Sequence, residues 1–209
     1  MRLEAAALQR IEAAVKDAER STAGEIVVVV APHSASWGAV RTALALPVAA
    51  LGGALLDRVV EMDAGWMALA VTTLFVIAWL LAGAGPITRW LAGSGGLDAA
   101  VLRAAKVAFV DHGVHATKAR AGVLVYLSLL ERRVQVLGDA GVHAIVGDAG
   151  WASVAARVSG AMKGNNIDAL IDVVRDVGAT LAKAFPRAPN DENELPDAVR
   201  TGRRTLASE

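Results

Sequence analysis

The chain has 209 residues, enough for one domain and an insertion, and 55% of them are hydrophobic although only 4% are aromatic. Lysine plus arginine equal aspartate plus glutamate at 21 each, so the charge balance gives no signal for nucleic-acid binding, and we expect no nucleic-acid partner. The absence of cysteine excludes disulfides, zinc–thiolate centres and cysteine nucleophiles.

The N-terminal region carries charges every few residues and no apolar core, so we expect no signal peptide there. Leu8, Ile11, Val15 and Ala18 recur at helical spacing, which predicts an amphipathic helix that the sequence STAG at 21–24 ends. Residues 26–30 are then five consecutive β-branched side chains. Such a run is typical of a strand buried on both faces, in a sheet covered by helices on each side.

An uncharged stretch of 25 residues at 64–88 predicts a membrane-spanning helix. At about 1.5 Å per residue it reaches roughly 37 Å, more than the hydrocarbon core of a bilayer. Trp66 and Trp90 lie near its ends, where tryptophan favours the membrane interface, and Arg89 follows it directly. The alternative is a buried core helix, but soluble core helices rarely run this long without a charge.

The preceding apolar stretch is shorter. Residues 42–56 are uncharged and contain Pro47 and a Gly52-Gly53 pair, which membrane helices tolerate. Alone they are compatible with a re-entrant or interfacial segment, whereas residues 37–60 together are long enough to span. We therefore expect a transmembrane hairpin inserted at 37–93, with helices at about 38–60 and 64–88.

Charge asymmetry predicts the orientation of this hairpin. The connector at 57–63 holds three acidic residues and one base, whereas Arg41 and Arg89 flank the outer ends. The positive-inside rule then places both termini in the cytoplasm, as a multi-pass protein of a bacterial inner membrane with the lipid bilayer as a partner. If the strands before and after the insertion share one sheet, the insertion must cross an even number of times.

After the hairpin, the sequence GSGG at 93–96 predicts a flexible link, and Asp98 is a candidate cap for a helix. Residues 123–130 and 133–137 predict two strands of a hairpin around a turn at 131–132. Short helices are expected near 141–146 and 151–162, and a long helix from 167 to 185 that Pro186 ends. The tail at 189–209 is polar, and we expect it to be extended or disordered beyond Pro196.

Together these elements predict an α/β fold: a mixed sheet flanked by helices on both faces, with an inserted two-helix transmembrane hairpin. The first helix and strand occupy residues 1–36, the insertion 37–93, the remainder of the domain 94–188, and the polar tail 189–209.

Five short stretches, in this order and spacing, resemble the TPM-domain family: RIEAAV at 10–15, STAGEI at 21–26, TKARAGVLV at 117–125, VLGDAGV at 136–142 and NELPD at 193–197. The chain is most similar to a bacterial branch whose members end in the same NELPD stretch. The resemblance implies a mixed sheet between helix layers. Members of the family are described as phosphatases, as calcium binders or as accessory factors of membrane complexes, so the resemblance does not select one activity.

Asp139 is the first candidate for a functional residue. It follows a strand and precedes a short helix, at the sheet edge where open α/β folds put ligands, and the resemblance places it near the acidic groups of calcium-binding members. Its other interpretation is an N-cap. Asp148 is a candidate second oxygen ligand or a turn residue, and Glu25 either faces the same crevice or contacts solvent. Any Ca²⁺ would be held by separated loops, since no EF-hand pattern is present.

His112 and His115 are three residues apart, which on a helix places both imidazoles on one face. A metal pair competes here with the favoured interpretation, a helix C-terminus, because no third zinc ligand is indicated. Arg120, Arg132 and Arg133 flank the two central strands. They are candidate phosphate ligands, but solvation at strand ends or attraction to lipid headgroups is the favoured interpretation.

Several enzyme classes are excluded because their motifs are missing: the phosphate-binding P-loop, the dinucleotide-binding glycine turn and the nucleophile elbow. The sequence therefore favours a cytoplasm-facing interaction or accessory module for an unknown membrane protein partner, rather than an enzyme. The alternative is a weak phosphatase assisted by a divalent metal at Asp139 and Asp148.

Overall fold

The computed structural model describes residues 5–147, 150, 154, 167–187, 195 and 198–201. The chain forms two compact units. The first, here called the α/β unit, comprises Met1–Ser34 and Asp98–Glu209, and the second, here called the hairpin unit, comprises Ala35–Leu97. The insertion expected from hydropathy is thus a compact unit of its own.

In the described part of the chain, the α/β unit is built on a four-stranded mixed sheet of order β3-β2-β1-β4. Its strands are β1 (Glu25–Ala31), β2 (Gly122–Ser128), β3 (Arg133–Gly138) and β4 (Arg200–Thr201). β1 runs parallel to β2 and to β4, whereas β2 and β3 form an antiparallel hairpin. The two strands predicted after the insertion are therefore present, and they pair as expected.

β1 is the central strand, and all seven of its residues are buried. It pairs with β2 along its whole length, from Glu25 opposite Gly122 to Ala31 opposite Ser128. The prediction of a strand buried on both faces is confirmed. The strands that precede and follow the insertion share one sheet.

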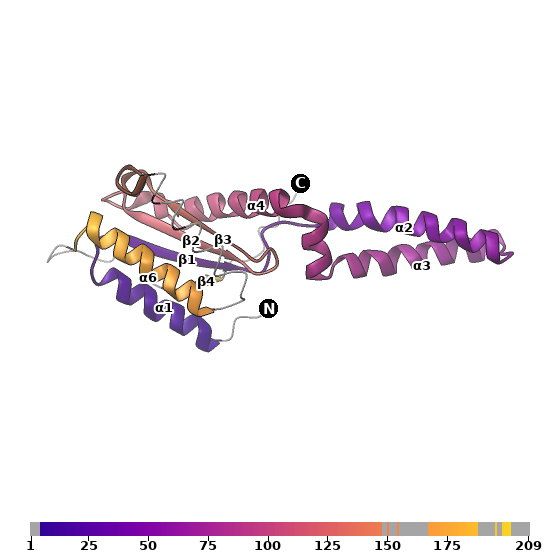
Figure 1. The fold of residues 1–209 in the computed structure, drawn as a ribbon, viewed down its shortest axis with the longest axis horizontal. Coiled ribbons are helices and arrows are strands. Elements are labelled where there is room, and N and C mark those ends of the chain that lie inside the picture. Colours follow the sequence, from indigo (N-terminus) through magenta and orange to yellow (C-terminus); the bar gives the residue numbers. More distant parts are fainter. Residues whose placement is uncertain are drawn as a thin grey trace. The chain divides into compact units, whose positions relative to one another are not determined.

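Helices cover both faces of this sheet (Figure 1). Ile26, Val28 and Val30 of β1 belong to a core with residues of α1 (Ala5–Glu19) and α6 (Ile167–Ala184). The alternate side chains, Val27 and Val29, pack with residues of α4 (Gly85–Asp111). The period of two along a strand sends successive side chains to opposite faces, so a continuous run of valines serves both cores.

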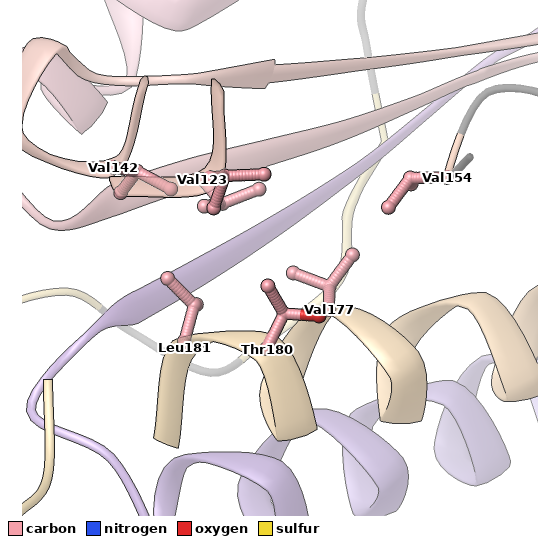
Figure 2. Close-up of a pocket in the computed structure, with 7 residues that line it drawn as sticks. Val123, Val142, Val154, Val177, Thr180 and Leu181 are labelled. Atoms are coloured by element: carbon pink, nitrogen blue, oxygen red, sulfur yellow. The ribbon is translucent and has the colours of Figure 1, made fainter. Parts of the chain in front are cut away.

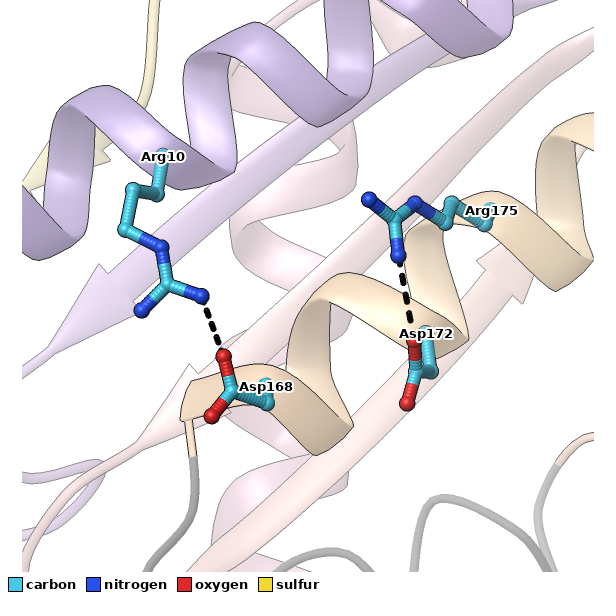
Figure 3. A network of polar contacts seen from close by, with 4 residues as sticks. All are labelled: Arg10, Asp168, Asp172 and Arg175. Atoms are coloured by element: carbon cyan, nitrogen blue, oxygen red, sulfur yellow. Dashed lines mark hydrogen bonds and ion pairs between the residues drawn. The ribbon is translucent and has the colours of Figure 1, made fainter.

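α1 and α6 lie side by side on their face of the sheet. A Cβ atom at Gly178 would lie 2.5 Å from Cβ of Ala18, so the two helices approach as closely as a glycine allows. Arg10 of α1 forms an ion pair with Asp168 of α6, and Arg175 pairs with Asp172 within α6 (Figure 3). All four side chains are exposed, so each pair contributes at most about 1 kcal/mol.

The hairpin unit contains α2 (Gly38–Val59) and α3 (Ala64–Ala82), with mean hydropathies of 1.7 and 2.0. Both are long and apolar enough to cross a membrane. Asp63 in the connector caps α3, because its carboxylate accepts hydrogen bonds from the backbone N–H groups of Gly65 at 2.9 Å and Trp66 at 3.0 Å.

α2 and α3 pack on each other through small residues. A Cβ atom at Gly53 would lie 2.6 Å from Cγ2 of Val71, and one at Gly52 would lie 2.8 Å from Cδ1 of Leu74. The glycine pair therefore faces α3, where its lack of side chains allows the close contact typical of membrane helices. Near the start of α2, the guanidinium of Arg41 lies 5.6 Å from the ring centroid of Trp79, which is near the end of α3.

The end of the hairpin differs from the prediction. α3 ends at Ala82 rather than at residue 88, and α4 begins at Gly85. Pro86 falls in the first turn of α4, where proline is tolerated, so the uncharged stretch divides between two helices. The Thr88 hydroxyl donates a hydrogen bond of 2.8 Å to the backbone carbonyl of Ala82 and fixes this bend.

Two further expectations are wrong. Residues 93–96 are not a free link but part of α4, which Gly93 interrupts with φ 65° and ψ 164°, values that glycine adopts readily. Asp98 consequently lies inside α4 and does not cap it; it accepts from Nε of Arg133 at 2.7 Å.

The polar tail also contributes to the sheet. Arg200 and Thr201 form β4, opposite Val29 and Val30 of β1. The helix expected near 141–146 is present at 140–147. The one expected at 151–162 lies outside the described residues, apart from Val154.

Candidate functional site

Asp139 lies between the end of β3 and the helix at 140–147, as its sequence context predicts. Its backbone N–H donates to the carbonyl of Gly122 at 2.8 Å, which ties it to the first residue of β2. Because β3 is antiparallel to β2, its end meets the beginning of the parallel strands. Asp139 is therefore not at the carboxyl edge where open α/β folds put ligands, and that part of the prediction is wrong.

The carboxylate of Asp139 is buried and has two partners. Oδ2 lies 2.9 Å from Nε of Arg120, and Oδ1 accepts from the backbone N–H of Ala140 at 2.7 Å. The second contact is to the first residue of the helix at 140–147, and not to its second or third, so it differs from the N-cap hydrogen bond that the sequence offered as an alternative. The guanidinium supplies the positive charge that a buried carboxylate requires.

Arg120 is held for this contact by its backbone. It adopts φ 53°, which is uncommon for a residue with a side chain, and its N–H donates to the carbonyl of Thr117 at 3.0 Å. A Cβ atom at Gly141 would lie 2.6 Å from the carbonyl oxygen of Arg120, so only glycine fits beneath this turn. Backbone contacts therefore hold Arg120 in place next to Asp139.

Glu25 lies at the same amino edge as Asp139, since it is the register partner of Gly122, and its side chain is buried. Asp148 lies outside the described residues. Among the described residues, no group of three histidine, aspartate or glutamate side chains is arranged to hold a metal ion. Asp139 and Asp148 thus stay a prediction as calcium ligands.

His112 directly follows Asp111, the last residue of α4, in agreement with the favoured interpretation of a helix C-terminus. His115 belongs to the short 3-10 helix η1 (Val114–Ala116), so the two imidazoles do not share the helix face that a metal pair would need. Nδ1 of His112 lies 3.0 Å from Nη1 of Arg200 in β4, whereas the ring of His115 lies 6.4 Å from that of Phe109. Burial lowers the pKa of His112, and the charge of Arg200 lowers it further, against the opposite effect of Asp111.

Arg132 and Arg133 take structural positions. Arg132 occupies the left-handed region, with φ 53°, in the turn between β2 and β3. Nε of Arg133 pairs with Asp98 of α4 at 2.7 Å. The guanidinium of Arg133 is thus engaged within the fold.

A second polar cluster, here called the carboxyl-edge cluster, was not predicted from the sequence. It consists of Ser34, Tyr126, Ser128 and Glu131, at the edge where β1 and β2 end. The Ser34 hydroxyl donates to Oγ of Ser128 at 2.7 Å and lies 3.4 Å from the Tyr126 hydroxyl. The only sequence signals for it are a serine that closes an apolar strand and an acid in the following turn.

Glu131 is the centre of this cluster, and its side chain is fully buried. Oε1 accepts from the backbone N–H of Ser34 at 3.0 Å, and Oε2 accepts from the Ser128 hydroxyl. Burial raises the pKa of Tyr126, while its hydrogen bond with Ser34 acts in the opposite direction. Ser34 is the last residue of the α/β unit before the insertion, so Glu131 fixes the point at which the chain leaves the sheet.

A small cavity lies between the sheet and α6 (Figure 2). It holds about 10 Å³ of space, and Val177, Thr180 and Leu181 of α6 border it on one side. Val123 and Val142 line the opposite side. Such a space barely admits one water molecule, so it is a packing gap rather than a ligand pocket.

No protein-family model and no curated protein sequence matches the chain. A solved structure is similar to it: the NMR structure of BA42 protein from the psychrophilic bacterium Bizionia argentinensis sp. nov.. The likeness has a TM-score of 0.60, covers 97% of each chain and includes 22% identical residues. At this identity it shows a shared fold and no shared activity.

Proposed function

We propose that this chain is a membrane-anchored interaction or accessory module, in which α2 and α3 cross a bacterial inner membrane and the α/β unit faces the cytoplasm. The observation that carries the proposal is the surface of the hairpin unit. Large apolar side chains are exposed along both helices, and in an apolar stretch of 18 residues only 17% is buried in α2 and 6% in α3. These side chains include Leu46, Leu51, Leu55, Leu69, Val76, Ile77, Leu80 and Leu81.

Such a surface is unfavourable in water. Exposed apolar area costs about 25 cal/mol per Å², and hydrocarbon removes that penalty. A helix pairs its backbone groups internally, as a lipid environment requires, and membrane helices tolerate the hydrogen bond that Pro47 removes from α2. A soluble core helix would instead bury most of its apolar side chains, which neither helix does.

The pairing of β1 with β2 supports two crossings. These strands flank the insertion in sequence and lie in one sheet, so both must be on the same side of a membrane. The acidic connector, with Glu61 and Asp63, and the bases Arg41 and Arg89 at the other ends support the cytoplasmic orientation. The resemblance to the TPM-domain family belongs to the same proposal, supported by the five stretches and by a mixed sheet between helix layers.

An interaction role is favoured over catalysis. The carboxylate that a metal-assisted phosphatase would need, on Asp139, is engaged by Arg120 and by the N–H of Ala140. The Glu131 carboxylate is engaged by Ser34 and Ser128. These two acids thus support the fold, so we do not propose the phosphatase alternative.

Co-purification of the tagged full-length chain from gently solubilised membranes tests the proposal. Val76→Arg with Ile77→Arg places two charges in the exposed middle of α3, where each costs about 2.5–3.5 kcal/mol in a bilayer. The matched control places the same arginines at Ala6 and Ala13, which are exposed on α1. We expect a discrete membrane complex with the wild type and the control but not with the α3 variant.

Two results would contradict the proposal. Release of the wild-type chain from membranes by alkaline carbonate would refute the anchor. Retention in membranes with no partner under any mild detergent would refute the accessory role.

A further inference from the structure

The part of α4 that follows Gly93 has one face on the sheet and another in solvent. Val101, Ala105 and Ala108 are buried in the core against β1 and β2. On the opposite side, Val107 is 48% exposed and Val110 is 59% exposed. Arg103 and Lys106 are exposed beside these valines.

These four residues form one stripe, here called the α4 outer stripe: Arg103, Lys106, Val107 and Val110. Residues three and four apart on a helix are neighbours, so the two bases and the two valines that follow them share one exposed face. Neither Arg103 nor Lys106 takes part in an ion pair within the described residues. Of the acids at the two ends of this helical segment, Asp98 pairs with Arg133, and Asp111 is exposed next to Val110.

We infer that the α4 outer stripe binds the surface of an anionic bilayer. Exposed basic and apolar side chains that share one helix face are typical of helices at the interface, where the bases attract anionic headgroups and the apolar groups enter the acyl boundary. Only residues 83–102 separate Arg103 from the end of α3, so a hairpin anchored in a membrane keeps the stripe within reach of the bilayer by chain length alone. The inference rests on the proposed function, since it requires the hairpin to be in a membrane.

The absence of cysteine allows a direct test in the full-length chain. Single cysteines are introduced as Val110→Cys in the stripe, Ile77→Cys in the hairpin and Lys16→Cys on the exposed side of α1, and each is labelled with an environment-sensitive fluorophore. Each protein is reconstituted in nanodiscs of phosphatidylcholine or of phosphatidylcholine with phosphatidylglycerol. Spin-labelled lipids then quench any fluorophore that contacts the bilayer.

We expect quenching of the Val110→Cys label in anionic nanodiscs, weaker quenching in neutral ones, and none of the Lys16→Cys label. Arg103→Gln with Lys106→Gln should reduce the quenching at the stripe while that of the Ile77→Cys label is unchanged. High salt should act like the double substitution, because it screens the headgroup attraction.

Three results would overturn the inference, and they are distinguishable. A quenched Ile77→Cys label with an unquenched Val110→Cys label refutes the stripe alone and leaves the anchor standing. Equal quenching at Val110 in both lipids, insensitive to the charge variant, refutes recognition of anionic headgroups. An unquenched Ile77→Cys label refutes the membrane anchor and the stripe together.

Discussion

Val28 of β1 and Val125 of β2 are register partners in a parallel pair, although the whole hairpin unit lies between them in the sequence. A parallel pair always needs a crossover connection, usually a helix packed on the sheet. Here α4 covers one face of the sheet, and the hairpin is an additional insertion before it. The chain must return from the insertion to the same sheet, so a hairpin that enters a membrane has to leave it on the side where it entered.

The first prediction concerns this topology. In cells, Glu61→Cys in the connector should react with a membrane-impermeant maleimide added from outside, whereas Lys16→Cys should react only after permeabilisation. A reporter fused after Glu209 should behave as cytoplasmic. Labelling of both cysteines from outside, or a periplasmic signal from the reporter, would contradict the two-crossing arrangement.

A second prediction concerns the contact of α1 with α6. In an open helix position, Gly178→Ala would stabilise by about 1 kcal/mol through helix propensity. Here the new Cβ atom would lie 2.5 Å from Cβ of Ala18, so we expect a net loss of about 1–3 kcal/mol from overpacking. Thermal unfolding of the full-length chain in detergent measures it.

The control for this contact is the double variant Ala18→Gly with Gly178→Ala, which moves the methyl group from one helix to the other. It should recover most of the loss, as a favourable coupling energy in a double-mutant cycle. If the single variant Gly178→Ala raises the unfolding midpoint instead, the helices do not touch at this point.

The sequence predicted the elements whose signal is local. Five β-branched residues in a row specify a strand covered on both faces wherever it packs, and residues 26–30 lie in β1. Hydropathy likewise predicts α2 and α3, because length and apolar content alone decide whether a helix can span. Neither prediction depends on which strands are neighbours in the sheet.

What the sequence did not reveal depends on contacts between distant residues. Glu131 meets Ser34 only because β1 and β2 are parallel and in this register, and Ser34 has no local signal. The edge at which Asp139 lies follows from the antiparallel direction of β3. β4 consists of two polar residues, Arg200 and Thr201, which have no strand pattern and pair because the edge of β1 is open to them.

A third prediction concerns the contact of His112 with Arg200. Arg200 donates, so the imidazole must be neutral, and burial together with Arg200 keeps the pKa of His112 below its ordinary 6.5. The unfolded chain then takes up the proton at a higher pH than the folded chain does. The contribution of neutral His112 to the free energy of unfolding is complete above pH 6.5. It is lost as the pH falls from there through the pKa of His112 in the folded chain.

We therefore expect the unfolding midpoint of the wild type to fall on acidification in this range, and His112→Gln to flatten the dependence. His33→Gln replaces an exposed histidine and is the matched control. Hydrogen exchange should show that the amides of Arg200 and Thr201 lose protection first. An unchanged pH dependence in His112→Gln would contradict the assignment.

A fourth prediction concerns the stability of the Arg120–Asp139 pair. Asp139→Asn keeps the shape of the side chain but removes its charge and with it the ion pair, which lacks hydrogen-bond geometry; we expect a loss of about 1–3 kcal/mol, as when a buried polar group loses its partner. Arg120→Gln should cost at least as much, because it leaves a buried carboxylate with one neutral donor. Arg133→Gln removes a more exposed pair and should cost less than about 1 kcal/mol.

The same pair makes the predicted calcium site at Asp139 testable. An ion bound to the folded form raises stability by RT ln(1 + [L]/Kd), so a real site must shift the unfolding midpoint with Ca²⁺ concentration. Because Arg120 occupies the carboxylate, we expect no shift in the wild type and none in Asp139→Asn. A concentration-dependent shift that Asp139→Asn abolishes, and that Arg120→Gln enlarges by freeing the carboxylate, would show instead that Asp139 is a metal ligand and that Arg120 competes with the ion.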